Sequence, residues 1–488
     1  MKKNFLLFLT MGLLFAACKK DDNTIPPGPS ADLTVQDFMW RAMNLWYFWQ
    51  DDVANLADNK FADTTEGNQA YEEFLASEDD PAAFFDNRLL FNEDRFSFYS
   101  EDYKELTQAL SGISKSNGLE FGLVRFQGND ELFGYVRYIV PDSDASIKDI
   151  SRGELFTGVN GTTLDINNYQ DLLFGDEDTY TLNMADITNN TVTPNEKEVT
   201  LTKQPNLAEN PVFLSKSFDV NGEIIGYLVY NGFTNEYDED LNNAIGDLKA
   251  AGVTNLVLDL RYNPGGSVNS ARLLSSMIYG TNTSNLFLRQ RWNSKVQSQF
   301  SDEQLEDYFA DKTNDGTPLN ALNLNQVYVI ATGSSASASE LVMNGLAPYM
   351  NVIHIGETTR GKNEFSITMV DDAQGSYIFN PDRESNINSN NQWAIQPLVG
   401  RNENADGFSD YTNGLEPNIE LQEDLENLGV LGDQNEPLLA RAIQEITGVS
   451  SKRDFTVSMP ANVMTSSKMF TPMKDNMVLD KPLNINFQ

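Results

Sequence analysis

The hydrophobic and polar positions of this 488-residue chain change their period several times along its length. In residues 206–450, short apolar runs of strand length alternate with stretches of helical period. Such alternation predicts β-α-β units around a partly parallel sheet, and therefore an α/β domain. The expected strands are residues 224–230, 256–260, 327–331 and 352–355, and the expected helices are residues 240–251, 267–278 and 340–347.

Different patterns flank this domain. Residues 33–110 are rich in aromatic side chains with few helix breakers, which predicts a small N-terminal helical domain. Residues 111–205 hold short β-type runs separated by turn residues, which predicts a small β-rich domain. Residues 451–488 hold few periodic apolar positions and several Ser, Pro and Lys residues, so we expect a disordered C-terminal tail.

The chain starts with the pattern of a secretory signal, two lysines followed by an apolar run. The run is too short to span a hydrocarbon layer of about 30 Å as a stable helix. It ends in Ala16-Ala17-Cys18, which resembles the lipobox of bacterial lipoproteins. We therefore expect residues 1–18 to form a lipoprotein signal that ends at the lipid-bearing Cys18, and residues 19–32 to form a flexible tether.

The lipid signal predicts where the protein is located. A lipid on Cys18 would hold the chain on the extracytoplasmic side of a bacterial membrane, with the outer membrane favoured, facing the periplasm or the cell surface. Cys18 is the only cysteine in the sequence, so it cannot form an internal disulfide. The alternative is an ordinary cleaved signal peptide in which this cysteine is incidental.

Charge excludes one class of partner. Aspartate and glutamate outnumber lysine and arginine by 71 to 34, and the excess is spread along the chain. Such a negative field repels phosphate backbones, so we expect no nucleic-acid partner. The acidic excess is interpreted as a solubility feature.

Few residue types are available for hydrolytic chemistry. The single histidine, His354, lies inside an apolar strand-like run, which disfavours a Ser-His-Asp triad. Cys18 is assigned to the anchor, and no His/Cys cluster has the ligand spacing of a zinc site. A protease with this sequence would need Lys, Asp or Glu as its base. Lysine can serve only where burial or neighbouring groups lower its pKa.

A serine-rich run, residues 331–340, joins an expected strand to an expected helix. Backbone N–H groups and the helix dipole at such a turn favour a developing oxyanion. The residues from Ser337 to Glu340 also fit Ser-x-x-Glu, a capping box that starts a helix without any chemistry. This segment by itself leaves both interpretations open, and the capping box is the simpler one.

Two further segments favour the catalytic interpretation. Residues 256–266 form an apolar strand that ends in Asn-Pro-Gly-Gly, and residues 356–362 read Gly-Glu-Thr-Thr-Arg-Gly-Lys. With the serine-rich turn, they resemble the catalytic domain of the C-terminal processing (tail-specific) peptidases. The resemblance implies a ClpP/crotonase-like α/β fold in which Ser337 is the nucleophile. It also implies that Lys362, 25 residues later, is the general base.

The same resemblance implies the remaining parts of the site. The oxyanion donors would be the N–H of Ala338 and the N–H of one turn glycine, either Gly265 or Gly266. Ser366 stands where many members of the family carry a glutamine that bonds the lysine, and its hydroxyl could still orient the amine. No metal or organic cofactor is implied.

The β-rich domain resembles a PDZ domain in two motifs. Residues 118–122, Gly-Leu-Glu-Phe-Gly, would form the carboxylate-binding loop, and residues 153–161 would form a strand and an Asn-Gly turn. The resemblance implies a groove that binds the C-terminal segment of a polypeptide substrate by adding a strand. The alternative is an unrelated β-domain with a common Asn-Gly turn. The groove residues would include Gly118, Leu119, Phe121 and Gly122.

One competing motif is rejected. Residues 356–362 also fit the Gly-x-x-x-x-Gly-Lys pattern of a P-loop. Asn363 stands where the Mg²⁺-binding Ser or Thr is required, and the apolar positions 365, 367 and 369 alternate as in a strand. A P-loop must open a helix, so no nucleotide site is expected here.

The sequence thus predicts a lipid-anchored serine endopeptidase that cleaves extracytoplasmic polypeptides through an acyl-enzyme. The rival hypothesis is a non-catalytic lipoprotein that keeps this fold to bind peptides or hydrophobic ligands. The presence of both Ser337 and Lys362 argues against the rival.

Overall fold

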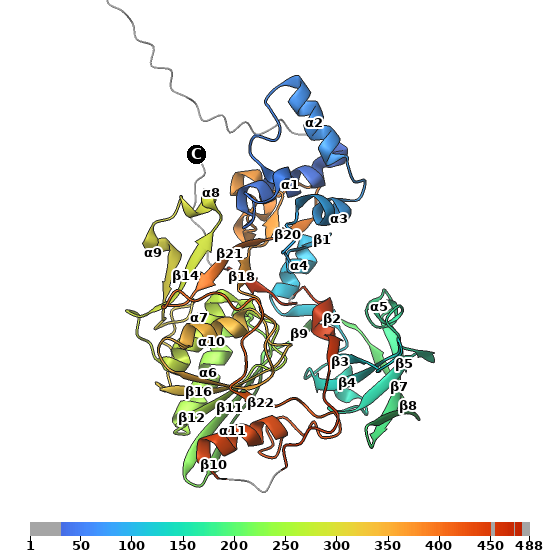
Figure 1. Ribbon diagram of the computed structural model, residues 1–488, viewed down its shortest axis with the longest axis vertical. Helices are drawn as coiled ribbons and strands as arrows, with labels where there is room; N and C mark the ends of the chain where they lie inside the picture. Colours follow the sequence, from blue (N-terminus) through green and yellow to red (C-terminus); the bar gives the residue numbers. More distant parts are fainter. Residues whose placement is uncertain (1–30, 450–453, 473, 481–488) are drawn as a thin grey trace, which may run out of the picture.

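The α/β domain is built on a sheet with the strand order β10-β11-β12-β16-β17-β22 (Figure 1). The structure is a computed structural model that describes residues 31–449, 454–472 and 474–480. β10 is antiparallel to β11, and the later neighbours are parallel. The strands are β10 (Val212–Val220), β11 (Glu223–Tyr230), β12 (Asn255–Asp259), β16 (Gln326–Ala331), β17 (Asn351–Gly356) and β22 (Ile419–Glu420).

Helices cover both faces of this sheet. Helices α6 (Asp238–Ala250), α7 (Val268–Tyr279) and α10 (Ala338–Leu346) pack on one face, and α11 (Pro437–Thr447) packs on the other. Because both faces are covered, the parallel strands are continuous apolar runs. The expected strands and helices of this domain are confirmed, with ends that differ by one or two residues.

The N-terminal helical domain, drawn in blue, lies at the top of Figure 1. Helix α1 buries its aromatic face, including Phe38 and Trp46, in the main core. The N–H of Phe48 donates to the carbonyl of Leu398, which joins this domain to a second sheet. The helical prediction is confirmed. The helices are α1 (Thr34–Trp46), α2 (Thr65–Leu75), α3 (Pro81–Phe84) and α4 (Tyr103–Leu110).

The second sheet has the order β13-β24-β18-β21-β14-β15, and a smaller one has the order β1-β20-β19. A strand begins two residues after Lys362, as expected from the alternating apolar positions and against a P-loop. The elements are β13 (Gly266–Ser267), β24 (Met477–Val478), β18 (Glu364–Ser366), β21 (Leu398–Glu403), β14 (Leu286–Trp292), β15 (Glu306–Tyr308), β1 (Phe98–Ser100), β20 (Ala394–Gln396), β19 (Met369–Val370), α8 (Ser294–Gln297) and α9 (Asp302–Leu305).

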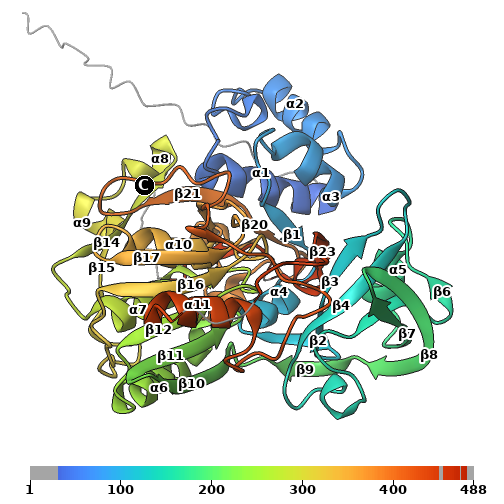
Figure 2. The ribbon, with the colours of Figure 1, turned by 60° about the horizontal axis from the view of Figure 1, so that its bottom comes forward.

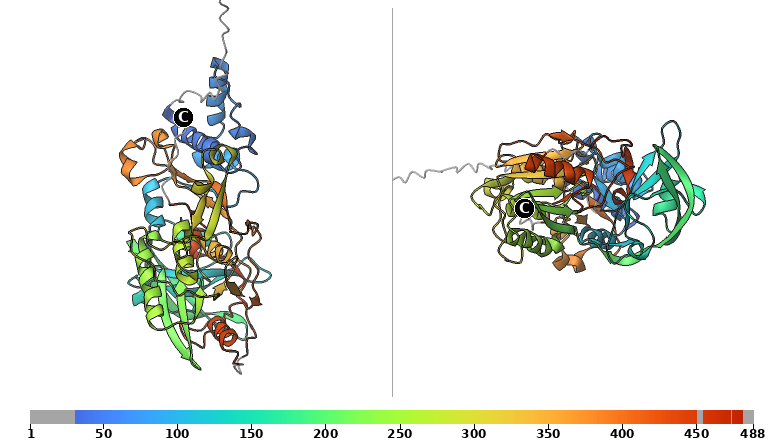
Figure 3. Two further views of the ribbon diagram at one scale, coloured as in Figure 1. Left: turned by 90° about the vertical axis from the view of Figure 1, so that its left-hand side faces the viewer. Right: turned by 90° about the horizontal axis from the view of Figure 1, so that it is seen from below.

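The β-domain, built from β3 to β8, lies beside the α/β domain in the view from below (Figure 3, right). It has its own apolar core, and the pair of β2 and β9 lies where the chain enters and leaves it. The predicted β-rich character is confirmed. The elements are β2 (Ile113–Ser116), β3 (Leu119–Arg125), β4 (Leu132–Ile139), β5 (Leu155–Val159), β6 (Thr162–Thr163), α5 (Tyr169–Phe174), β7 (Thr179–Thr188), β8 (Thr191–Thr202) and β9 (Gln204–Ala208).

The prediction of a disordered C-terminal tail is wrong for the C-terminal segment, by which we mean the described residues 454–472 and 474–480. Strand β23 (Val463–Ser466) adds to the β-domain beside β3 (Figure 2), and β24 lies between β13 and β18 in the second sheet. These short strands pair with partners far away in the sequence. They therefore carry no period of their own that could have revealed them.

The chain start lies outside the described residues, so the signal, Cys18 and most of the tether are not part of the structure. In the residues that are described, no helix combines the length and apolarity needed to cross a bilayer.

A buried ionic cluster joins the end of β12 to the β-domain and to the chain that precedes α11. Arg261 pairs with Asp259 and Glu436, each at 2.7 Å. It also shares Glu423 with Arg152 of the β-domain, at 3.1 and 2.8 Å. Burial by itself would raise the pKa of Glu423, but Arg152 and Arg261 outweigh it and hold that pKa at about 2.

This cluster predicts a pH-dependent loss of stability in Glu423→Gln. We expect its free energy of unfolding at pH 7 to fall by about 3 kcal/mol, because two buried arginines lose a carboxylate partner. The folded-state pKa of Glu423 lies below its ordinary value of 4.5, so the contribution is complete above pH 4.5 and is lost as the pH falls toward 2.

Urea denaturation at pH 7 and pH 3 measures this effect. The difference between wild type and Glu423→Gln should shrink at pH 3, and an equal difference at both pH values would contradict the assignment. The exposed Glu426 offers a matched control, since Glu426→Gln should change stability by only about 0.5 kcal/mol or less.

Candidate active site

Ser337 lies in the turn between β16 and α10, as the N-terminal cap of the helix. Its backbone has φ 62° and ψ −113°, a conformation that is strained for a non-glycine residue and that concentrates at functional sites. The side chain is fully buried, and Oγ has no hydrogen-bond partner among the described residues. Buried hydroxyls nearly always have a partner, so this one is available to another group.

The other hydroxyls of this turn have structural roles. Ser335 and Ser339 donate to backbone carbonyls of the loop after β12, at 2.7 and 3.0 Å. Ser334 accepts a hydrogen bond from the guanidinium of Arg137 in the β-domain, at 3.0 Å. The structure thereby singles out Ser337 within the serine-rich turn.

The glycine turn after β12 faces Ser337. Gly265 and Gly266 have positive φ of 112° and 133°, and a Cβ on Gly265 would lie only 2.7 Å from the Cβ of Ser337. The N–H of Gly265 donates within the turn, to Oδ1 of Asn263 at 2.9 Å. The N–H of Gly266 instead donates to the carbonyl of Asn476 at 2.5 Å. Of the two glycines that the sequence left open, the geometry favours Gly266 as an oxyanion donor.

Lys362 enters the site from the loop between β17 and β18. Its side chain is only 1% exposed, and Nζ lies 5.1 Å from the centre of the Phe96 ring. Burial lowers the pKa of the Lys362 amine to about 8, although the charges of Asp475 and Glu364 act in the opposite direction. An amine with this pKa is neutral in a substantial fraction of molecules near pH 8, so it can accept a proton.

Glu340 joins these two segments. One carboxylate oxygen accepts from the N–H groups of Ser337 and Lys362, at 2.7 and 2.9 Å. The other accepts from the N–H of Gly361 at 2.7 Å and the hydroxyl of Thr359 at 2.5 Å. Burial raises the pKa of Glu340 to about 7, although these donors favour the ionised form. The backbones of Ser337 and Lys362 are thus fixed to a single oxygen atom.

Ala338 and Ser366 are the two remaining residues that the sequence places in the site. Ala338 begins α10, so its N–H lies in the first helical turn, where amides have no intrahelical acceptor. The hydroxyl of Ser366 bonds to Oδ1 of Asn476 at 3.0 Å and accepts from Nε2 of Gln396 at 2.9 Å. These bonds lead toward the C-terminal segment, and they do not support the expectation that Ser366 orients the Lys362 amine.

His354 is a strand residue, as expected from the sequence. It lies inside β17, where Nε2 is 3.2 Å from the carbonyl oxygen of Ala331. Burial lowers its pKa, so the ring is neutral at physiological pH.

Sequence reasoning missed three contributors to the site. Glu340 was recognised only as a capping residue, although the Ser-x-x-Glu motif was the signal that could have identified it. Phe96 and Gln396 lie far from Ser337 and Lys362 in the sequence and belong to no motif. Only the fold brings them into contact with Lys362 and Ser366.

The residues predicted to form a carboxylate-binding loop lie at the start of β3, on the edge that pairs with β23. Gly118 has φ +80°, and Gly122 pairs with Ser466 in the ladder. The N–H of Phe121 donates to Oγ of Ser467 at 3.0 Å. This edge therefore already holds a strand of the chain's own C-terminal segment. Gly118, Leu119, Phe121 and Gly122 lie together here.

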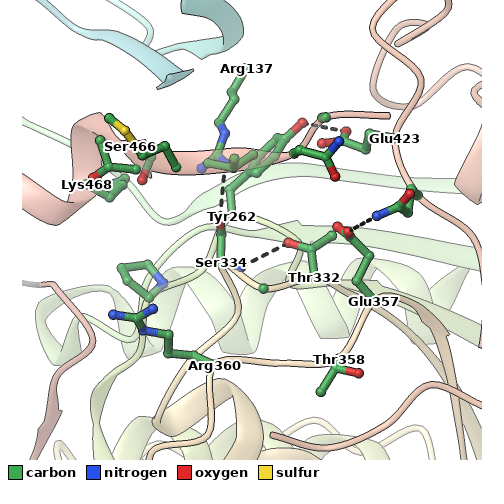
Figure 4. A pocket seen from close by; sticks show the side chains of 18 of the residues that line it. Arg137, Tyr262, Thr332, Ser334, Glu357, Thr358, Arg360, Glu423, Ser466 and Lys468 are labelled. Carbon is green, nitrogen blue, oxygen red and sulfur yellow. Dashed lines mark hydrogen bonds between the residues drawn. The ribbon is translucent and has the colours of Figure 1, made fainter. Parts of the chain in front are cut away.

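A cavity of about 850 Å³ opens between the β-domain and the α/β domain (Figure 4). The guanidinium of Arg137 stacks on Tyr262, 4.8 Å from the ring centre, and bonds to Ser334 in the serine-rich turn. Ser337 itself does not line the cavity, which therefore borders the site without containing it. Its lining comes from both domains and from the C-terminal segment, and it includes Arg137, Tyr262, Ser334, Glu357, Arg360 and Lys468.

These features indicate a class of chemistry. A buried hydroxyl without a partner, a buried amine with a lowered pKa and a glycine N–H aimed at a carbonyl are the parts that acyl transfer by serine requires. Across the ranges that the structure describes, no group of three or more His, Cys, Asp or Glu side chains is placed to hold a metal ion. The fold is that of an α/β protein, and its candidate site brings such a hydroxyl, amine and glycine N–H together in one region.

Comparison with known proteins gives the family. Residues 224–420 match the model of peptidase family S41, and residues 34–98 match the peptidase S41 N-terminal domain. The chain belongs to peptidase family S41, which confirms the resemblance inferred from the motifs.

Individual relatives agree with this assignment. The chain is 28% identical over 159 residues to carboxyl-terminal-processing peptidase 3, chloroplastic, of Arabidopsis thaliana, covering 31% of this chain and 27% of the relative. It is 29% identical over 163 residues to the carboxyl-terminal-processing protease of a Picosynechococcus strain, covering 32% and 33%. The alignments thus span about a third or less of each relative.

A solved structure covers more of the molecule. This chain has 26% sequence identity to an S41 protease of Bacteroides fragilis whose crystal structure is known, and the two structures superpose with a TM-score of 0.63. The similarity covers 85% of this chain and 97% of that chain. The overall fold is therefore shared over nearly the whole described chain.

The geometry at Glu340 predicts that Glu340→Gln damages both stability and activity. A glutamine can accept at one terminal atom only, so two of the four donors would lose their acceptor inside the protein. We expect the free energy of unfolding to fall by roughly 2–4 kcal/mol. The loss of a negative charge near Lys362 should also lower the pKa of its amine.

Two measurements check this role. Urea denaturation should show the loss of stability, and the midpoint of kcat/KM against pH should move below that of wild type. Glu357 lies in the same loop as Lys362 and accepts a hydrogen bond from Gln422. Glu357→Gln is therefore the matched control, and it should leave the pH midpoint of kcat/KM in place. An unchanged pH midpoint in Glu340→Gln would show that Glu340 does not act on the site.

Proposed function

We propose that this protein is a serine endopeptidase of the C-terminal processing type, with Ser337 as nucleophile and Lys362 as general base. The observation that carries the proposal is the pairing of an unpartnered, buried Ser337 Oγ with a buried lysine whose pKa is lowered to about 8. Glu340 holds the backbones of both residues. Family membership and the names of the relatives support the same activity.

In this mechanism, the neutral amine of Lys362 removes the proton of Ser337 as Oγ attacks the scissile carbonyl. The N–H groups of Gly266 and Ala338 stabilise the negative charge that develops on the carbonyl oxygen. The protonated Lys362 then gives its proton to the leaving amine, and water hydrolyses the acyl-enzyme. Burial serves this sequence because it excludes bulk water and keeps the amine partly neutral.

For substrate binding, we propose that the β-domain is a PDZ-like module that recruits polypeptides by their C-terminal segments. Strand addition at the edge of β3 supports this, since β23 already pairs there in antiparallel fashion. The alternative of a non-catalytic binding protein is not favoured, because it gives no reason for a strained, unpartnered serine and a buried lysine whose backbones share one carboxylate oxygen.

The location follows from the sequence alone. We propose that Cys18 carries a lipid that holds the enzyme on the extracytoplasmic side of a bacterial membrane, where it would cleave extracytoplasmic polypeptides. Residues 19–32 would give the folded part its distance from the membrane surface.

The lowered pKa of Lys362 predicts how activity depends on pH. Because the neutral amine is the active form, kcat/KM on a peptide should rise about tenfold per pH unit below pH 8 and level off above it. Lys362→Ala and Lys362→Arg should lose at least roughly 10²–10⁴-fold, since arginine stays protonated. His354→Gln is the control that should retain the wild-type profile. A collapse of activity in His354→Gln, or near-normal cleavage by Lys362→Ala, would show that the base is assigned wrongly.

The anchor has its own test. Cys18→Ser should abolish incorporation of labelled palmitate and should release the protein from the membrane fraction. Retention of the variant in the membrane fraction would refute a lipid on Cys18.

A further inference from the structure

The C-terminal segment runs through the candidate active site. The carbonyl oxygen of Asn476 accepts the N–H of Gly266 at 2.5 Å. A Cβ built on Gly265 would meet both this oxygen and the Oγ of Ser337, so the carbonyl lies beside the nucleophile. The chain continues past this carbonyl into Met477. A peptide carbonyl that accepts a backbone N–H beside a serine hydroxyl has the arrangement expected of a scissile bond.

The residues after this carbonyl are held as a strand of the catalytic domain. Met477 and Val478 pair in parallel with Gly266 and Ser267. The N–H of Leu479 donates to the carbonyl of Ser366 at 3.0 Å. Main-chain pairing of this kind holds a polypeptide on the leaving-group side of the bond, and the side chains of Met477 and Leu479 pack in the main core.

The side chain of Asn476 is buried and hydrogen-bonded. It is 1% exposed, Oδ1 accepts from Ser366 at 3.0 Å, and Nδ2 donates to the carbonyl of Pro472 at 3.0 Å. The preceding residue, Asp475, is buried and pairs with Arg360 at 3.0 Å. Both residues before the candidate bond are therefore recognised by polar partners.

The same segment also occupies the edge of β3. Strand β23 pairs with β3, and Ser467 bonds to the backbone of Phe121. Phe470 stacks on Phe174 of α5, with ring centres 3.9 Å apart and planes at 14°. Figure 2 shows this red segment between the β-domain and the α/β domain. One continuous stretch of sequence thus engages the recruiting edge first and the active site afterwards.

We propose that the chain is its own first substrate, and that Ser337 cleaves the Asn476–Met477 bond in cis and removes residues 477–488. This inference rests on the proposed function. Until that bond is cut, the segment occupies the edge of β3 and the Gly266 N–H that other polypeptides would use.

The cleavage consumes one water molecule. Ser337 Oγ forms an ester bond to the carbonyl carbon of Asn476 as the bond from that carbon to the nitrogen of Met477 breaks. The serine proton passes through the amine of Lys362 to the nitrogen of Met477. Water then splits the ester, which returns a proton to Oγ and leaves a carboxyl group on Asn476, whose proton passes to the new amino group of Met477 to give a carboxylate and an ammonium.

Intact mass spectrometry of the purified full chain tests this proposal. We expect the wild type to lose the mass of residues 477–488, and Ser337→Ala and Lys362→Ala to keep them. Ser298→Ala, at an exposed serine that follows α8, is the matched control and should be processed like wild type. Loss of the segment in Ser337→Ala, or cleavage at another bond, would overturn the proposal.

Two further outcomes separate this inference from the proposed function. A wild type that cleaves an added peptide but keeps residues 477–488 would refute self-cleavage and leave the peptidase intact. A wild type that cleaves neither would refute both. For the cis route, Ser337→Ala mixed with wild type should remain full length while the wild type is processed, and its processing under those conditions would refute that route.

Discussion

Four donors from two segments of the chain converge on the buried carboxylate of Glu340, and the geometry of the site depends on this convergence. Ser337 and Lys362 lie on different strand ends, so helix and sheet geometry alone would not fix one against the other. The shared carboxylate does so through their backbones, which leaves both side chains available for chemistry. A carboxylate can accept several hydrogen bonds at once, whereas no neutral side chain of this size could satisfy the same donors.

Burial acts on the side chains of Ser337 and Lys362 in complementary ways. It leaves Ser337 Oγ without a partner, because the neighbouring serines use their hydroxyls to fasten the turn. It also lowers the pKa of Lys362, because a desolvated amine loses the hydration that favours its charged form. Burying these polar groups lowers the stability of the fold. The packed apolar layers on both faces of the central sheet offset this loss.

The C-terminal segment connects the β-domain to the candidate active site. It pairs with the edge of β3, borders the cavity between the domains and ends in the second sheet beside Gly266. Backbone pairing at both places uses main-chain groups, so another extended polypeptide would compete for the same positions. The chain's own segment competes with the advantage of being covalently attached, which gives it a high effective concentration.

The sequence by itself determined the α/β alternation, the helical and β-rich domains, and the motifs that carry Ser337 and Lys362. It could do so because periodicity and short motifs depend on residues that are close along the chain. Three features depend on the tertiary structure alone: the reach of Glu340 to a second loop, the close approach of the glycine turn to Ser337, and the docking of the C-terminal segment. Each depends on contacts between residues distant in sequence, whose free energy comes from burial and pairing in three dimensions. Such contacts cannot be inferred from the local sequence pattern. The C-terminal segment, which has no periodicity, therefore forms two strands and reaches the candidate site without a signal in its sequence.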